Sequence, residues 1–409
     1  MSESKVLKIG IMGCKRGGPF VGIFRTIKDV EVPCVCETDP VTVENIKKRY
    51  PDVKVYSDFD EFLTHPMDAV ILANFFPEHA PYAIKCLEKN IHVLSECVAN
   101  GTMAEGVSLC EAAEKSSAIY MLAENYPFMD FNREMKRVYE GGSLGKIYYA
   151  EGEYNHPMDW YDTKAVLSIR PYEKHWRNFL PRSYYITHSL APIMSATGSF
   201  PKRVTAMPVY APLPEDCPTA SHVADVAAII SILNDDGSVF KVTGCSAFGA
   251  HWNSYRLCCE KGQIENVRGT DKVMLRYNDW QIPEGKEAVN FYTPDLKDED
   301  SEQIKNAGHG GGDFLVIKAF FGSIRSGKPH QFDVYFATAL SSVAILSHRS
   351  IMEGSRPFEV PDFRNKEDRD RFRDDTLSPF WLSDGTPPSY PCCSDPDYLP
   401  SEWQTENYR

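Results

Sequence analysis

The chain has 409 residues, 43% of them hydrophobic, which is enough for two domains with sizeable cores. Its 44 basic and 57 acidic residues give a formal net charge of −13, which argues against a nucleic-acid partner. No run reaches the ~18 apolar residues of a membrane-spanning helix, and the amino-terminal sequence lacks the pattern of a secretion signal. The twelve cysteines contain no C-x-x-C pair, so we expect reduced thiols, no metal and a cytoplasmic protein with no membrane partner.

Strand-like and helix-like patterns alternate over residues 1–125. Apolar runs typical of strands occupy residues 5–13, 31–37, 68–75, 91–96 and 119–125. Helical spacing occupies residues 21–30, 40–50, 80–90 and 102–117. Alternation with crossovers of this length predicts an α/β fold, a Rossmann-type doubly wound parallel sheet.

Residues 126–360 have a different texture. After a helical pattern at 131–142, β-branched runs follow at residues 146–154, 203–211, 223–233, 239–248 and 253–262. Two late helical patterns cover residues 313–327 and 334–354. We expect a second α/β domain over 126–360 with an open, mostly antiparallel sheet. Residues 361–409 are rich in Pro, Asp and Tyr, which favours a tail that wraps a surface or a neighbouring subunit, so we expect a homo-oligomer, a dimer or higher.

The turn after the first strand, "GCKRGG", resembles a dinucleotide-binding fingerprint. Gly13 and Gly18 match its first and third glycines, while Lys15 stands at the second position. A plain glycine-rich turn between a strand and a helix is the alternative. Glu37, which ends the next strand, would accept hydrogen bonds from the ribose hydroxyls and favour NAD over NADP.

Further polar residues follow other strands of the expected parallel sheet, at the edge where such sheets bind ligands. With the turn residues they form our predicted cofactor site, which comprises Gly13, Lys15, Arg16, Gly17, Gly18, Glu37, Asn74, His79, Glu96 and Asn125.

Four local motifs carry a family resemblance: "SECVANG", "EGEYNHPM", "HWRNFLPRSYYITHSLAPIM" and "GHGGGDF". Their order over about residues 6–360 resembles the Gfo/Idh/MocA oxidoreductases. Usual members carry a lysine directly after the glutamate that corresponds to Glu96, whereas this chain has Cys97. The lysine-free motif is similar to that of the NAD-dependent glycoside hydrolases of family 109, the α-N-acetylgalactosaminidase branch. Ile186 and Ser189 depart from that pattern, so the sugar specificity need not transfer.

Four residues are our candidates for catalysis. Tyr185 and His188 stand three residues apart in a segment with helical character, so we expect their side chains to share a face and to exchange protons. Core packing is the alternative for both. Tyr154 and Glu124 end strand-like runs, where burial would make a carboxylate a stronger base. Which of Tyr154, Tyr185 and His188 removes the substrate proton stays open.

The resemblance implies a glycosidase that uses NAD for transient oxidation of a sugar at C3. Elimination across C1–C2, addition of water and re-reduction would then complete hydrolysis. The alternatives are a conventional NAD-dependent sugar or cyclitol dehydrogenase and a non-catalytic sugar-sensing protein.

A basic, aromatic segment lies between the first two β-branched runs. Guanidinium groups match carboxylate, sulfonate or phosphate oxygens, so the segment favours an anionic sugar such as a uronic acid or a sulfosugar. A solvated basic face is the alternative. Our predicted substrate-binding residues are His156, Arg170, Lys174, Trp176, Arg177, Arg182 and His309.

Overall fold

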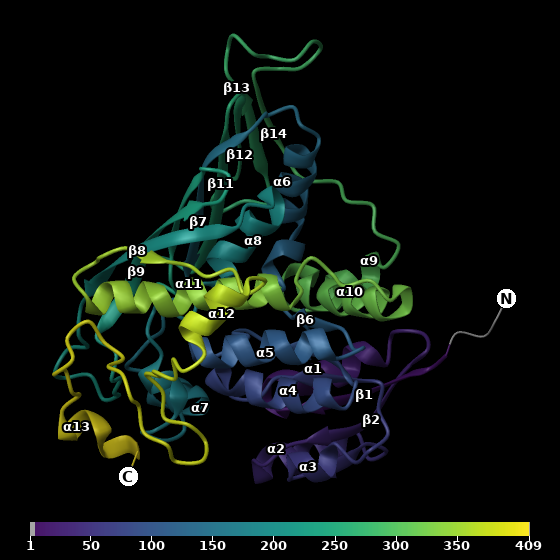
Figure 1. Ribbon diagram of the computed structural model, residues 1–409, viewed down its shortest axis with the longest axis vertical. Helices are drawn as coiled ribbons and strands as arrows, with labels where there is room; N and C mark the ends of the chain where they lie inside the picture. Colours follow the sequence, from purple (N-terminus) through teal and green to yellow (C-terminus); the bar gives the residue numbers. More distant parts are fainter. Residues whose placement is uncertain (1–4, 409) are drawn as a thin grey trace. The chain divides into compact units, whose positions relative to one another are not determined.

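The computed structural model describes residues 5–408, which form two compact units (Figure 1). The first unit runs to Asn125 and also contains residues 299–338 and 363–376. The second unit contains residues 126–298, 339–362 and 377–409. The chain therefore returns twice to the first unit through segments that the sequence pattern assigned to the second domain and the tail.

The first unit contains a six-stranded sheet in the order β3-β2-β1-β4-β5-β6, and all of its strand pairs are parallel. The strands are β1 (Leu7–Met12), β2 (Val30–Cys36), β3 (Lys54–Tyr56), β4 (Ala69–Leu72), β5 (His92–Ser95) and β6 (Tyr120–Leu122). The helices are α1 (Cys14–Phe24), α2 (Pro40–Arg49), α3 (Phe59–Phe62), α4 (His79–Glu88), α5 (Met103–Lys115), α9 (Ser301–Asn306), α10 (Gly312–Ser326) and α12 (Lys366–Phe372). The predicted Rossmann-type sheet is confirmed.

Local sequence explains where these elements begin. All four residues of β4 are buried, as expected of a central parallel strand covered on both faces. Helix α5 starts with a capping box in which the Thr102 hydroxyl accepts from the Glu105 N–H and the Glu105 carboxylate accepts from the Thr102 N–H. It lies beside α4 (Figure 1).

The second unit contains a nine-stranded sheet in the order β14-β13-β12-β11-β7-β10-β9-β8-β15. Its strands are β7 (Ile147–Asn155), β8 (Pro201–Tyr210), β9 (Asp225–Asn234), β10 (Val239–Thr243), β11 (Trp252–Cys259), β12 (Gly262–Asn266), β13 (Val273–Tyr277), β14 (Val289–Tyr292) and β15 (Phe358–Glu359). Only the β7–β10 pair is parallel among the described strand pairs of this sheet, so the predicted mostly antiparallel sheet is confirmed. Its helices are α6 (Asp130–Glu140), α7 (Thr163–Ile169), α8 (Thr187–Thr197) and α13 (Glu402–Thr405), and α11 (Val334–Met352) belongs to it from Ala339 onward.

The last described part of the tail, residues 377–408, packs onto its own unit. The Phe380 ring is fully buried and lies edge-on to the Tyr184 ring, with centroids 5.2 Å apart. The backbone N–H and the hydroxyl of Ser394 donate to the Asp225 carboxylate. The tail thus completes the core of the second unit.

Within residues 5–408, no helix combines the length and the apolar character needed to cross a bilayer. The same residues contain no group of three or more His, Cys, Asp or Glu side chains placed to hold a metal ion.

Candidate functional site

The glycine-rich turn is the first turn of α1. Gly13 has a left-handed φ of 83°, and a Cβ on it would lie 2.3 Å from the backbone oxygen of Ala73, which follows β4. A Cβ on Gly17 would lie 2.5 Å from the Ile11 side chain of β1, whereas one on Gly18 would make an ordinary 3.5 Å contact with Ile46. Gly13 therefore allows the tight turn and Gly17 the close packing of helix on strand.

Glu37 ties this turn to the end of β2. Its carboxylate, 9% exposed, accepts backbone hydrogen bonds from Cys14 (2.7 Å), Thr38 (2.8 Å) and Asp39 (2.9 Å). A carboxylate has about four lone-pair sites, so one acceptor position is left for a ribose hydroxyl. Lys15 is exposed beside the turn, with its amine 4.0 Å from the Asp39 carboxylate.

Two asparagines at strand ends carry buried carbonyl oxygens without a hydrogen-bond partner in the described structure. They are Oδ1 of Asn74, after β4, and Oδ1 of Asn125, after β6. Unpaired buried acceptors of this kind fit a ligand that brings its own donors, such as an amide or a hydroxyl. The turn, the acid and the two asparagines therefore fit a dinucleotide.

His79, a predicted cofactor residue, is a neutral ring beside the loop that follows β5. The ring is buried, and burial lowers its pKa to about 4, so it is neutral. Its Nδ1 donates to the Val98 carbonyl oxygen at 2.8 Å. His79 therefore holds the loop that follows β5, and its Nε2 is a buried acceptor without a partner.

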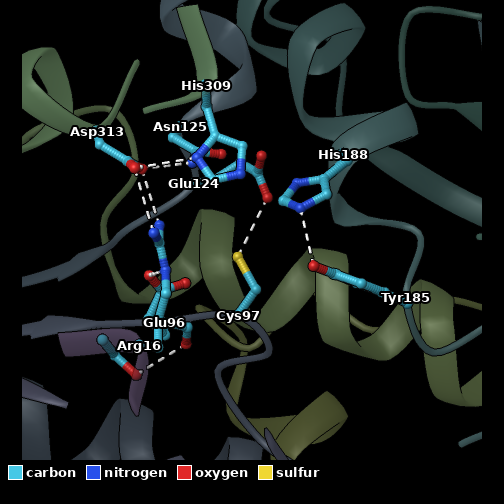
Figure 2. Close-up of polar contacts among 10 residues, drawn as sticks. Arg16, Glu96, Cys97, Glu124, Asn125, Tyr185, His188, His309 and Asp313 are labelled. Carbon is cyan, nitrogen blue, oxygen red and sulfur yellow. Dashed lines mark hydrogen bonds and ion pairs between the residues drawn. The ribbon is translucent and has the colours of Figure 1, made fainter. Parts of the chain in front are cut away.

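An ionic network in the first unit joins Arg16 to two carboxylates (Figure 2). The Arg16 guanidinium donates to Glu96 at 2.7 Å and, in a two-pronged contact, to Asp313 at 2.8 and 3.2 Å. Asp313 also accepts from Asn125 Nδ2 at 2.8 Å and from His309 Nδ1 at 3.0 Å. Burial alone would raise the pKa of Asp313, but the bonds from His309 and Arg16 and the Arg16 charge together lower it below the usual range.

At the position of the missing lysine, Cys97 has a thiol that hydrogen-bonds the buried Glu124. Cys97 Sγ donates to the Glu124 carboxylate at 3.1 Å, and the Glu124 side chain is fully buried (Figure 2). Glu96, one residue earlier, is engaged by Arg16. Strand β5 therefore ends in a carboxylate and a thiol, and neither is an ammonium group that could shuttle a proton.

A second cluster lies in the second unit. The Tyr185 hydroxyl is 3.0 Å from His188 Nε2 (Figure 2). The buried His188 ring stacks on Tyr126, with centroids 3.9 Å apart, and meets the Tyr154 ring edge-on at 5.0 Å. Burial raises the pKa of Tyr154 far above that of a free phenol, and the neighbouring Tyr185 and Tyr126 add to the shift. Tyr154 is therefore a neutral hydroxyl, and Tyr185 with His188 is the pair suited to proton transfer.

The local fold explains how this pair forms. Helix α8 begins only at Thr187, so Tyr185 lies in the preceding turn, and the predicted common helical face is wrong. A Cβ on Gly152 of β7 would lie 1.9 Å from the Ser189 carbonyl oxygen, so only glycine lets the first turn of α8 lie this close to the strand. That contact brings His188 next to Tyr154, on the same strand as Gly152.

The predicted substrate residues fall into four places. His156 Nδ1 lies 3.0 Å from His251 Nδ1, and burial followed by His251 and Arg177 lowers the pKa of His156. The exposed Lys174 amine covers the Trp381 ring at 4.2 Å. The half-exposed His309 lies in the first unit and bonds Asp313. The other four lie in the second unit, where Trp176 and Arg170 are buried, Arg177 and Arg182 are half-buried, and the charges of Arg182 and Arg177 act on Arg170.

The sequence analysis did not name Asp313, Tyr126 or His251 as site residues. Asp313 accepts hydrogen bonds from three side chains, and its signal was the acid of the "HGGGD" motif. Tyr126 lies four residues after the end of β6, the last strand of the first unit, and directly follows the predicted Glu124 and Asn125. The position of His251, just before β11, carries no comparable pattern.

The fold and the cofactor site agree with family models. Residues 7–124 match the model described as oxidoreductase family, NAD-binding Rossmann fold, and residues 267–368 match the one described as glycosyl hydrolase 109, C-terminal domain. The first unit is thus built around an NAD-binding Rossmann domain of the Gfo/Idh/MocA oxidoreductases. The chain joins this domain to a C-terminal domain of the glycosyl hydrolase 109 type, which confirms the resemblance and the expected NAD cofactor.

Individual relatives are similar along most of their length but distant. The chain is 23% identical to a glycosyl hydrolase family 109 protein of Shewanella pealeana, covering 87% of this chain and 85% of the relative. It is also 23% identical to an alpha-N-acetylgalactosaminidase of Shewanella oneidensis, over 88% and 86%.

Solved structures share the fold. Levoglucosan dehydrogenase with NADH and L-sorbose superimposes with a TM-score of 0.71 at 16% identity, over 88% of this chain and 100% of that one. An Agrobacterium radiobacter oxidoreductase with NAD+, L-tartaric acid and magnesium gives 0.68 at 14% identity, over 87% and 99%.

Proposed function

We propose that the protein is an NAD-dependent glycosidase that cleaves its substrate without net oxidation. The observation that carries this proposal is the separation of tasks between two clusters. The end of β5 has no lysine, while a tyrosine–histidine pair suited to proton transfer, Tyr185 and His188, lies in the second unit. The glycosyl hydrolase 109 match and the relatives named for glycosidase activity support the same reaction.

The residues that would hold the cofactor are those whose geometry fits a dinucleotide. The Gly13 turn would receive the pyrophosphate, Glu37 the ribose and the orphan oxygens of Asn74 and Asn125 the polar groups at the strand ends. When bound, NAD⁺ supplies reversible hydride transfer with a sugar carbon. Arg16, by pairing with Glu96 and Asp313, fixes these two carboxylates in place.

The proton chemistry falls to the second unit. Once a sugar carries a ketone at C3, its C2 proton becomes acidic, and His188 removes that proton through the Tyr185 hydroxyl. The C1–O bond then breaks, and the pair gives that proton to the departing aglycone oxygen. Water next adds across the C1–C2 double bond, with its hydroxyl going to C1 and its proton passing through the same pair to C2. Tyr126 and Tyr154 hold the imidazole by stacking and by edge contact, so that Nε2 faces Tyr185.

The absent lysine follows from this scheme. A lysine after Glu96 would serve the hydroxyl that is oxidised, as in a simple dehydrogenase. An elimination also needs a base that removes the C2 proton. A relay of phenol and imidazole can accept both this proton and the proton of the hydroxyl that is oxidised. Cys97 then has only to donate its thiol hydrogen to Glu124.

The test follows deuterium and the cofactor together. Purified protein with NAD⁺ is incubated in D₂O with a panel of neutral and anionic glycosides, and NMR and absorbance at the NADH band are recorded. The proposal expects a free sugar with deuterium at C2 and no lasting NADH.

Two results would overturn it. Stoichiometric NADH with an intact glycosidic bond would identify a sugar dehydrogenase. Turnover of no member of the panel, by a protein that binds NAD⁺ and sugars, would favour a sugar-sensing protein.

A further inference from the structure

Three arginines of the second unit converge on one buried thiol. Burial raises the pKa of the Cys245 thiol, although the positive charges of Arg182, Arg177 and Arg170 act on it and oppose the shift. The Arg170 pKa is itself lowered, by burial and then by the charges of Arg182 and Arg177. These mutual effects show that the three guanidinium groups are neighbours.

The cluster has no ion-paired counter-charge among the described residues, although the charge of Asp225 acts on Arg182. None of the three arginines forms an ion pair with an acidic side chain of residues 5–408. Asp225 gives Arg182 only its backbone carbonyl, which accepts from Nε at 3.0 Å, while the Asp225 carboxylate is engaged by Ser394. Cys245 does not compensate the charge, because its thiol is neutral. A guanidinium keeps its proton throughout the physiological range.

Arg170 has a buried polar atom without a partner, and this favours binding of a ligand by the cluster. Its side chain is 7% exposed, and its Nε is buried without a hydrogen-bond partner. One Nη donates to Asn178 Oδ1 at 3.1 Å, and the guanidinium lies 4.6 Å from the Trp160 ring. Burying the Arg170 cation without an anion is costly, and binding of an anion between Arg170 and the half-buried Arg177 and Arg182 would offset that cost.

The backbone is shaped to hold this group. A Cβ on Gly244, just after β10, would lie 2.1 Å from the Arg182 carbonyl oxygen, so the Arg182 turn can lie against the strand end only because residue 244 is glycine. The next residue, Ser183, has a buried hydroxyl without a partner. Arg177 lies 4.4 Å from the Trp176 ring, which limits its mobility.

We propose that Arg170, Arg177 and Arg182 form a subsite for a carboxylate, sulfonate or phosphate group carried by the sugar. This inference rests on the proposed function for its sugar. The charges of Arg177 and Arg182 also lower the pKa of His156, whose ring lies 5.7 Å from Tyr154. His156 therefore links the subsite to the proton-transfer cluster, as binding of one glycoside by both would require.

The experiment measures binding in the presence of NAD⁺, by calorimetry. The probes are methyl glucosides and galactosides of both anomeric forms, each with a neutral, a carboxylate and a sulfonate C6 group, together with inorganic sulfate and phosphate alone. At least one anionic sugar should bind about 10- to 100-fold more tightly than its neutral partner, as expected for charge-assisted hydrogen bonds.

Matched variants assign the preference to the cluster. Arg177→Gln and Arg182→Gln should remove it and leave binding of the neutral sugar within about twofold, since they act on the charged group alone. Arg276→Gln makes the same charge change on an exposed residue of β13 and should keep the preference. Circular dichroism and NAD⁺ binding confirm that each variant folds.

The outcomes separate this inference from the proposed function. Equal binding of neutral and anionic sugars, or a preference that survives Arg177→Gln and Arg182→Gln, overturns the subsite, even if neutral glycosides incorporate deuterium at C2. Inorganic anions that bind as tightly as the anionic sugars, without displacing them, also overturn it. An arginine-dependent preference with no cleavage of any glycoside upholds the subsite and refutes only the glycosidase.

Discussion

Tyr185→Phe tests the proton-transfer pair while leaving its packing intact. The change deletes one hydroxyl, which lies 3.0 Å from His188 Nε2, and keeps the ring that meets Tyr154 at 5.7 Å. A positioned acid–base group contributes ~100- to 10,000-fold to rate, or ~2.7–5.5 kcal/mol of transition-state stabilisation. The lost hydrogen bond is half-buried, so the free energy of unfolding should fall by only about 1 kcal/mol. Activity should therefore fall far more than stability.

The assay compares kcat/KM, C2 deuterium incorporation and thermal unfolding of Tyr185→Phe with those of two matched variants. Tyr154→Phe removes a neutral hydroxyl and should cost at most about tenfold in kcat/KM, because a phenol with so high a pKa cannot act as the base. Tyr210→Phe removes an exposed hydroxyl bonded to Asp395 and should leave activity unchanged. If Tyr185→Phe keeps more than a tenth of the activity, or loses less than Tyr154→Phe, the assignment of the pair is wrong.

Three further predictions concern stability. Asp313→Asn should lower the unfolding free energy by about 2 kcal/mol near pH 7, since a buried acceptor of charged donors is lost. The folded-state pKa of Asp313 lies below the unfolded value of ~3.9. The difference in unfolding free energy between wild type and Asp313→Asn should therefore be at its maximum above pH ~3.9 and shrink as the pH falls below it. A difference that stays constant down to pH 2 in denaturant titrations would contradict the network. Gly13→Ala should abolish NAD⁺ binding and destabilise the first unit, because the new side chain would strain the left-handed backbone and clash with Ala73. Gly18→Ala makes only an ordinary contact and should stay folded. Equal calorimetric behaviour of the two variants would refute the geometry of the turn. Phe380→Ala should cost about 3–5 kcal/mol, and Leu399→Ala, 74% exposed, almost nothing; a silent Phe380→Ala would show that the tail is not part of the core.

Hydrophobic periodicity predicted the longer helices and strands and missed very short ones. β3 and α3 have only three and four residues, too few for a period to show. The helical pattern at 21–30 began seven residues after the true start of α1, because the first turn consists of the glycine-rich segment, which has little apolar spacing to detect. The return of residues 299–338 and 363–376 to the first unit depends on tertiary contacts, which local patterns do not contain.

For the candidate site, the sequence predicted several residues but not their partners. Glu37, Asn74, Glu96 and Asn125 follow from the rule that parallel sheets bind ligands at the carboxyl ends of their strands. Their present partners do not follow from it. Arg16 reaches Asp313, 297 positions away in the chain, and Tyr126 stacks on His188 across the fold of the second unit. Such pairs depend on the packing of distant segments, and only the folded chain shows how strongly burial raises the pKa of Tyr154.

At Glu96 and Cys97, the sequence and the structure together change the interpretation of the missing lysine. The sequence shows a strand end without its usual lysine, which alone is compatible with a damaged dehydrogenase. In the structure both residues are occupied: Glu96 accepts from Arg16, and Cys97 donates to a fully buried Glu124. A site that had merely lost a lysine would leave Glu96 and Glu124 as two carboxylates without compensation, at a high cost in desolvation. Arg16 and the thiol thus supply donors to both carboxyl groups, and this is why the proposed reaction takes its proton transfer from Tyr185 and His188 and not from this strand end.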